Sequence, residues 1–302
     1  MPHCLPQHDE FFACLELFQR RVVGISFPEY PHQLSRKEMD LFLQDPARTA
    51  HSRPDILALI FAALALGLQA GKYDMGGEVW AAGDLEAEKG DLYSKRWFRS
   101  CELVADLAVT AAMQSLRMSA FTSQPTLISI QALVMLGPYM TNNGRFLDAW
   151  SVFGLTFRLG QAIGLHRNPS HLDTAPSLRE CTTRRTLWWW MLHMDQQYSM
   201  TLGRPLGISG IGDSPSPEPL TTDPTTLRLG HFVDQFTILG RQILSSSQLI
   251  NGRIDSFTEK LTTLWDTMPA VLQFSRTWNE EDNGIPEWPL AAIATSESQD
   301  TP

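Results

Sequence analysis

Two residues of the segment 184–205 have side chains that could perform acid–base chemistry, His193 and Asp195. They lie among tryptophan, leucine and methionine residues, and burial in such surroundings shifts the pKa of a carboxyl group toward values useful for proton transfer. The same carboxylate, paired with an arginine, would instead join two helices as a buried ion pair. We favour the ion pair for Asp195, with Arg204 or Arg185 as its partner. For His193 we favour a hydrogen-bonded structural role.

The spacing of apolar residues predicts that this segment is a helix. Four of them recur at intervals of three or four positions along one face: Leu187, Met191, Met194 and Tyr198. Trp188 and Leu192 form a neighbouring face with Asp195, so the carboxylate lies beside apolar side chains. Three consecutive tryptophans cannot all face the same side of a helix, and we expect them in the core. Gly203 ends the helix, and Pro205 forbids its continuation.

Other patterns that could carry chemistry are incomplete in this sequence. The segment Gly67–Lys72 is one residue shorter than a phosphate-binding loop and lacks the required Ser or Thr. Several metal-ligating residue types occur near the start of the chain, but their spacing matches no common zinc site: His3, Cys4, His8, Asp9 and Cys14. We therefore expect no catalytic residue, no cofactor and no bound metal.

The composition indicates a chain with a large hydrophobic core. Hydrophobic residues make up 43% of its 302 residues. Its formal net charge is −9, whereas a free-standing nucleic-acid binder usually has an excess of basic residues. Six of the negative charges belong to residues 279–302, which contain no Lys or Arg. The four cysteines form no C-x-x-C pair, and this suits a reducing compartment. The most apolar window, residues 56–68, is too short to span a membrane.

Helical periodicity runs through the chain, without β-alternation of useful length. We predict an all-α fold, a multi-helix antiparallel bundle of long amphipathic helices joined by short loops. The predicted helices cover residues 11–18, 35–43, 56–70, 92–118, 125–136, 145–163, 184–202, 225–249 and 254–268. Ser35 and Asp55 are predicted N-caps, and Gly164 a left-handed C-cap. Gly154 and Gly160 predict the close approach of another helix backbone.

Two motifs, in this order along the chain, resemble those of a known family. The first is Gly164-Leu165-His166-Arg167, which follows a helix that contains a tryptophan. The second is the pattern Arg184-Arg185-x-x-Trp188-Trp189, then Asp195, then Gly203-Arg204-Pro205. Together they are similar to the signature of the fungal-specific transcription factor domain, the middle homology region of the Zn2Cys6 binuclear zinc cluster regulators. An aromatic helix and proline loop over residues 11–31 and an L-x-x-L-W-x-x-x-P element at 261–269 resemble further parts of that domain.

The resemblance implies an all-α regulatory domain in the nucleus that controls transcription, often of metabolic or secondary-metabolite genes. It brings no enzymatic residue, and the matched motif residues would brace the helical core: Arg185, Trp188, Asp195, Gly203 and Arg204. The predicted domain covers residues 11–275, with 207–224 as a linker or surface loop outside the core. Residues 1–10 and the acidic tail 276–302 are expected to be disordered.

The cysteines depart from the family pattern. The family's DNA-binding module holds two zinc ions with six closely spaced cysteines, whereas the four of this chain are spread from residue 4 to residue 181: Cys4, Cys14, Cys101 and Cys181. We therefore expect no direct DNA binding, either from a domain cut from a longer regulator or from a natural short form. The expected partners are other transcription regulators, co-regulator proteins or a small-molecule effector, and no membrane. Two alternatives stay open: a small-molecule-binding accessory protein of a biosynthetic pathway, and a helical enzyme that uses Asp195 and His193.

Overall fold

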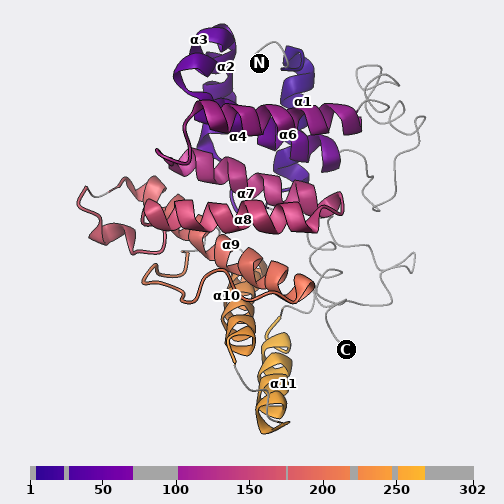
Figure 1. Cartoon of the computed structure of the whole chain (residues 1–302), viewed down its shortest axis with the longest axis vertical. Helices are drawn as coiled ribbons and strands as arrows, with labels where there is room; N and C mark the ends of the chain where they lie inside the picture. Colours follow the sequence, from indigo (N-terminus) through magenta and orange to yellow (C-terminus); the bar gives the residue numbers. More distant parts are fainter. Residues whose placement is uncertain are drawn as a thin grey trace. The chain divides into compact units, whose positions relative to one another are not determined.

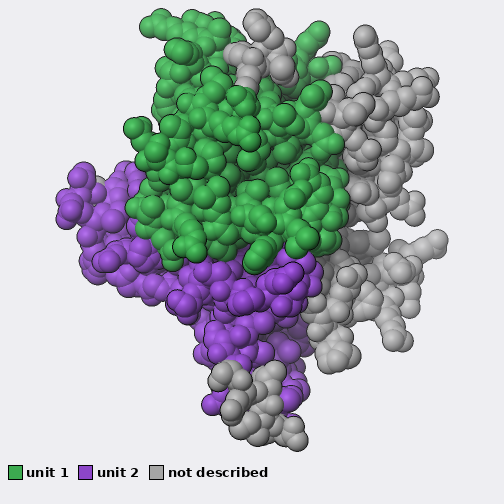
Figure 2. Space-filling model, in the orientation of Figure 1, with its two compact units in different colours: residues 1–163 green, residues 164–302 purple. Residues whose placement is uncertain are grey.

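The computed structural model describes residues 5–23, 27–70, 101–174, 176–217, 224–246 and 251–268. They belong to two compact units, residues 1–163 and residues 164–302, which Figure 2 shows in green and purple. Apart from an isolated bridge between Val23 and Phe27, the regular structure of the described residues is helical, which confirms the predicted all-α fold. The predicted domain limits, residues 11 and 275, stay a prediction. The predicted acidic tail and residues 92–100 of a predicted helix lie outside the described residues.

Unit 1 is built around a central helix, α4 (Pro54–Ala70). Its residues from Leu57 to Leu68 are buried on every side, because apolar side chains surround the whole helix. α4 contacts α1, α6 and α7, and α7 in turn contacts α8 (Figure 1). A short turn joins α7 to α8, so these two are antiparallel neighbours. The other described helices of this unit are α1 (His8–Arg21), α2 (Arg36–Gln44), α3 (Pro46–Ser52), α6 (Cys101–Met118), α7 (Leu127–Asn142) and α8 (Phe146–Ala162), with a 3₁₀ turn at His32–Leu34.

α7 extends well beyond its predicted end at Leu136. It begins where Thr126 and Ser129 cap each other's backbone N–H, and it continues through Pro138 to Asn142. Proline removes one helical hydrogen bond and usually ends a helix. Here the last turn is held instead by side-chain bonds to α6 and α4: Tyr139 Oη donates to Asp106 Oδ1 at 2.8 Å, and Asn142 Nδ2 donates to Gln69 Oε1 at 3.0 Å.

The N-terminus of α1 differs from the predicted one, and that of α2 lies at its predicted position. α1 begins at His8, inside the segment predicted as disordered, because Gln7 and Glu10 form a capping box. Ser35 occupies the predicted N-cap position of α2, but its side chain makes no capping hydrogen bond to the described residues.

Asp55, predicted as the cap of α4, lies instead inside its first turn, because Pro54 is the first residue of that helix. Its buried carboxylate accepts two hydrogen bonds from the Arg53 guanidinium, each at 3.1 Å, and one from Thr126 Oγ1 at 3.3 Å. Asp55 therefore links the start of α4 to the start of α7.

Unit 2 contains α9 (Leu178–Leu202), α10 (Pro224–Leu244) and α11 (Asn251–Trp265). Ser177 caps α9 through the backbone N–H of Glu180, and Gly203 ends it as predicted, with a φ of +60°. α10 contacts both α9 and α11. The contact of α10 with α11 and the turn after it is a hydrophobic cluster that includes Phe232, Phe236, Trp265 and Met268.

No single described helix is long and apolar enough to cross a membrane. By length and composition alone, α3 and α4 pass such a test as a pair, although they meet at an angle of 112°. α4 is a buried core helix. A helix that is apolar on all sides passes this test whether it lies in a protein core or in a membrane.

The close helix approach in unit 1 lies at Gly67. A Cβ at Gly67 would collide with the backbone oxygen of Cys14, so glycine allows α1 to approach α4. Gly154, where we predicted such an approach, is exposed, and no described heavy atom outside its chain neighbours and its own helix backbone lies within 4 Å of the position of its missing Cβ. The prediction for Gly154 is therefore wrong. Gly160 is buried, and its predicted role stays a prediction.

Gly67→Ala should lower the free energy of unfolding by about 1–3 kcal/mol, because the new methyl group has no room against α1. The matched control is Gly154→Ala, which adds the same group to an exposed helix interior. This control should raise the free energy of unfolding by about 0.5–1 kcal/mol. Urea denaturation followed by circular dichroism measures both, and equal effects would contradict the close approach at Gly67.

Candidate functional site

The predicted motif residues converge on one loop of unit 2, residues 204–217, which we call the clamp loop. It follows the left-handed turn at Gly203 and contacts both α9 and α10. Two of its residues belong to the core, Ile208 with 2% and Ser214 with 5% of their surface exposed. The prediction that residues 207–224 lie outside the core is therefore wrong for Ile208 and Ser214.

Asp195 holds the start of the clamp loop. Its Oδ1 accepts a hydrogen bond from Gly207 N at 2.8 Å, and its Oδ2 accepts from Ile208 N at 3.2 Å and from Arg241 Nη1 at 2.9 Å. Arg241 also donates to the backbone oxygens of Leu192 and Ile208. Asp195 is 3% exposed and Arg241 5%. A guanidinium thus neutralises the carboxylate and two backbone N–H groups bond to it, as a buried charge requires.

The cation that pairs with Asp195 differs from both predicted partners, Arg204 and Arg185. Arg185 lies ten residues earlier in the same helix, roughly 15 Å along its axis. Arg204 directly follows the turn at Gly203, and its side chain is exposed. Arg241 reaches the carboxylate because α10 packs on α9. No local spacing in the sequence indicates this pairing.

Two of the three consecutive tryptophans hold the rest of the clamp loop. Trp188 Nε1 donates to the backbone oxygen of Ile211 at 2.7 Å, and Trp189 Nε1 donates to that of Pro215 at 3.0 Å. Both rings are buried. Trp190 faces another side of α9, since successive residues are rotated by about 100° on a helix. The indoles therefore contribute apolar bulk to the core and donors to the loop backbone.

The motif that begins at Gly164 lies against the other side of the clamp loop. Gly164 turns the chain with a φ of +74°, as predicted. The backbone oxygen of His166 accepts hydrogen bonds from Asp213 N at 3.0 Å and from Ser214 N at 3.2 Å. Gly212 is required opposite this oxygen, because its φ is +84° and a Cβ would collide with it. The motif that begins at Gly164 therefore binds the clamp loop through its backbone.

His193 makes a hydrogen bond to α10. Its Nδ1 lies 3.1 Å from Oγ1 of Thr237, a residue that is 1% exposed. Burial lowers the pKa of His193 to about 4, so the imidazole is neutral at physiological pH. His193 and Asp195 therefore bind separate groups of α10. In the part of the chain that the structure describes, no three His, Cys, Asp or Glu side chains lie where they could hold a metal ion.

The remaining motif residues lie at the two ends of α9. Arg184 Nε donates to Glu180 Oε1 one turn earlier, at 2.8 Å, and Arg185 beside it is partly buried. At the other end, the backbone oxygen of Pro205 accepts a hydrogen bond from Ser199 Oγ at 3.3 Å. This last bond fixes the direction in which the clamp loop leaves the helix.

A glycine contact also fixes the position of α10 on α9. Gly240 directly precedes Arg241, and a Cβ at Gly240 would collide with the side-chain amide of Gln196. Gln196 directly follows Asp195 and is fully buried. A side chain of α9 therefore fills a notch in α10 that only glycine leaves open.

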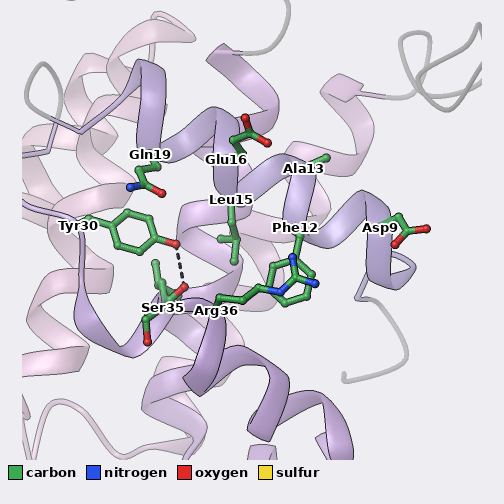
Figure 3. A pocket seen from close by; sticks show the side chains of 10 residues that line it. Asp9, Phe12, Ala13, Leu15, Glu16, Gln19, Tyr30, Ser35 and Arg36 are labelled. Atoms are coloured by element: carbon green, nitrogen blue, oxygen red, sulfur yellow. Dashed lines mark hydrogen bonds between the residues drawn. The ribbon is translucent and has the colours of Figure 1, made fainter. Parts of the chain in front are cut away.

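A groove of about 600 Å³ lies in unit 1, between α1 and α2, and we call it the α1 groove (Figure 3). Its lining includes the buried side chains of Leu15 and Leu34. Figure 3 shows Tyr30 on the opposite side from Phe12 and Arg36. The Arg36 guanidinium carbon lies 3.6 Å from the centre of the Phe12 ring. The lining combines apolar side chains with polar and charged ones, among them Asp9, Glu16 and Arg36. Sequence reasoning missed it because separate segments supply its lining.

Asp195→Ala should lower the unfolding free energy by about 3–5 kcal/mol, because Arg241 would remain buried without a counter-ion. Replacing both partners, with Asp195→Ala and Arg241→Met, should recover part of this loss. Thermal melting of the purified chain measures both variants. Asp213→Ala removes an exposed carboxylate 3.7 Å from His171 and is the control, with an almost unchanged midpoint. An unchanged midpoint for Asp195→Ala would refute the buried pair.

The stability of the chain should depend on His193 between pH 6.5 and 4. The folded pKa of about 4 lies below the unfolded value of about 6.5, so the unfolded state takes up the proton first. The stabilisation is therefore complete above pH 6.5 and is lost as the pH falls toward 4. Urea titrations at pH 7.5 and pH 5 should show a loss that is about 1–2 kcal/mol larger in the wild type than in His193→Gln. Equal losses in the two proteins would contradict a lowered pKa of His193 in the folded chain.

Sequence comparisons relate this chain to fungal regulators. An uncharacterized transcriptional regulatory protein of Schizosaccharomyces pombe is 28% identical over 203 residues, which are 64% of this chain and 23% of that protein. A second such protein of the same organism is 31% identical over 87 residues, 28% of this chain and 14% of the relative. Cutinase transcription factor 1 beta of Fusarium vanettenii is 29% identical over 82 residues, 27% of this chain and 9% of that protein. The chain therefore spans less than a quarter of the length of these relatives.

No solved structure matches the chain. The family described as fungal specific transcription factor domain matches residues 58–222, more than half of the sequence. This segment contains both sequence motifs, from Gly164 through Pro205, and the whole clamp loop. The chain therefore belongs to the fungal specific transcription factor domain family.

Proposed function

We propose that this chain is a regulatory module that controls the transcription of fungal genes in the nucleus, among them metabolic or secondary-metabolite genes. Membership of the family and the descriptions of its relatives as transcriptional regulators support this role. The all-α fold and the packing of the motif residues around the clamp loop agree with a module that works by binding.

The observation that carries this proposal is the complete engagement of the Asp195 carboxylate. Both of its oxygens accept hydrogen bonds from the protein's own groups, and 3% of the residue is exposed. A general base needs an oxygen within reach of a substrate proton. We infer that the chain acts without catalysis and that its motif residues brace α9, the clamp loop and α10. These residues are Arg184, Arg185, Trp188, Trp189, Asp195, Gly203, Arg204, Pro205, Gly164 and His166.

Promoter contact in this proposal comes from other transcription regulators or co-regulator proteins. A binuclear zinc cluster uses six closely spaced cysteines, and these 302 residues contain four that are spread from residue 4 to residue 181. The net charge of −9 also opposes binding to DNA phosphates. The regulatory input would then reach DNA through a protein partner.

The α1 groove is the proposed place for a small-molecule effector. Its lining combines apolar side chains with the charged groups of Asp9, Glu16 and Arg36, so it suits a molecule that has both an apolar and a polar end. An effector changes the activity of a regulator when it binds one conformation more tightly than another. The same groove favours the second candidate function, a small-molecule-binding accessory protein of a biosynthetic pathway.

A reporter experiment separates the two functions. We expect the whole chain, fused to an unrelated DNA-binding domain, to change transcription from the matching promoter several-fold in fungal cells. The fusion with Asp195→Ala should lose this effect because its clamp is destabilised, and Asp213→Ala should keep it. A silent fusion that is present at normal levels in the nucleus would refute the regulatory role and favour the accessory protein.

A further inference from the structure

The clamp loop contains two serines that are each followed by proline, Ser214-Pro215 and Ser216-Pro217. Serine followed by proline is the core sequence that proline-directed protein kinases accept. The structure places the two serines in different surroundings, although they are only two residues apart. Ser214 is 5% exposed, and its Oγ is buried with no hydrogen-bond partner in the described part of the chain. Ser216 is exposed, and the backbone on both sides of it is in neither helix nor strand.

We propose that Ser216 is a phosphorylation site for a proline-directed protein kinase, and that its phosphorylation releases the end of the clamp loop from α10. In this reaction the Ser216 Oγ attacks the γ-phosphorus of ATP, and the bond from that phosphorus to the β–γ bridging oxygen breaks. A carboxylate of the kinase takes the hydroxyl proton, and ADP leaves. Nothing in this step depends on the regulatory role proposed above.

The release follows from the partner of Ser216. Its hydroxyl donates a hydrogen bond to Oδ2 of Asp234 on α10. A phosphoserine carries a charge of about −1.5 to −2 at neutral pH and no longer has this hydroxyl donor. The modification would therefore replace an attractive contact by repulsion between two anions.

The surroundings of Asp234 already disfavour negative charge. Burial raises its pKa, while the hydrogen bond from Ser216 and the charge of His231 act in the opposite direction. Phosphorylation would remove the first of these two favourable contributions and add a second negative group. Separation of the loop from α10 is the response that returns both anions to water.

The loss of contact should reach the bonds next to Ser216 and end before those of Asp195. Trp189 holds the backbone oxygens of Ser214 and Pro215, directly before Ser216, so these bonds should open more often. Asp195 holds Gly207 and Ile208 at the other end of the loop, and these bonds involve neither the Ser216 hydroxyl nor Asp234. The phosphate would therefore loosen the end of the clamp loop near α10 and leave the buried ion pair of Asp195 in place.

The choice between the two serines tests the site. We would incubate the folded whole chain with a purified proline-directed kinase and ATP, and locate the phosphate by mass spectrometry. We expect phosphate on Ser216 and at most a few per cent of that amount on Ser214. A synthetic peptide of residues 208–222, which lacks the clamp, should take phosphate at both serines. Equal modification of both in the folded chain, or none at Ser216 while the peptide reacts, would overturn the assignment.

Hydrogen exchange tests the release. In the phosphorylated chain, the Trp189 indole N–H and the backbone N–H groups of Asp213 and Ser214 should exchange at least about fivefold faster than in the unmodified chain. Ser216→Ala removes the hydroxyl without adding charge and should give a smaller increase. Asp234→Asn keeps an oxygen acceptor without the negative charge, so its phosphorylated form should exchange at nearly the unmodified rate. Unchanged exchange after phosphorylation, or full acceleration in phosphorylated Asp234→Asn, would refute the release.

Discussion

A carboxylate that leaves water must find compensating charge and hydrogen bonds, and Asp195 finds them in two other segments of unit 2. Arg241 comes from α10, and the N–H groups of Gly207 and Ile208 come from the clamp loop. Removing any of them would leave a buried charge incompletely compensated. The helix, the loop and α10 must therefore assemble together, and the direction of the chain after Gly203 follows from this requirement.

The tryptophans extend the same arrangement along the loop. A loop that packs on buried helix side chains turns some of its backbone carbonyl groups away from water, and each of these needs a donor. Trp188 and Trp189 supply N–H donors from large apolar rings, so they fill space and bond the backbone with the same side chain. On the other side of the loop, the backbone oxygen of His166 accepts hydrogen bonds from two loop N–H groups. Both family motifs thus act on one irregular segment.

Local patterns in the sequence predicted what depends on local geometry. The apolar spacing placed α9, and Gly203 and Gly164 adopt the left-handed turns that were predicted for them. The pairing of Asp195 with Arg241 joins residues that are 46 positions apart, and no spacing rule connects them. The prediction for Gly154 failed for a related reason: a glycine in a helix indicates room for a neighbour but does not identify one. The α1 groove likewise required the folded chain, because its walls come from α1, the segment at Tyr30 and α2.

The adjacency of Gly240 and Arg241 has a consequence for the motion of unit 2. The notch for Gln196 and the cation for Asp195 occupy consecutive positions on both helices. If α10 slid by one turn along α9, the side chain of a residue three or four positions from Gly240 would meet Gln196, and the guanidinium would leave the carboxylate. An intermediate position of α10 would lose both the fit of Gln196 at Gly240 and the ion pair of Asp195 with Arg241. Gradual sliding of α10 along α9 is therefore unfavourable. α10 can seat or unseat as a whole, so a signal that acts on this helix would be transmitted as a discrete step.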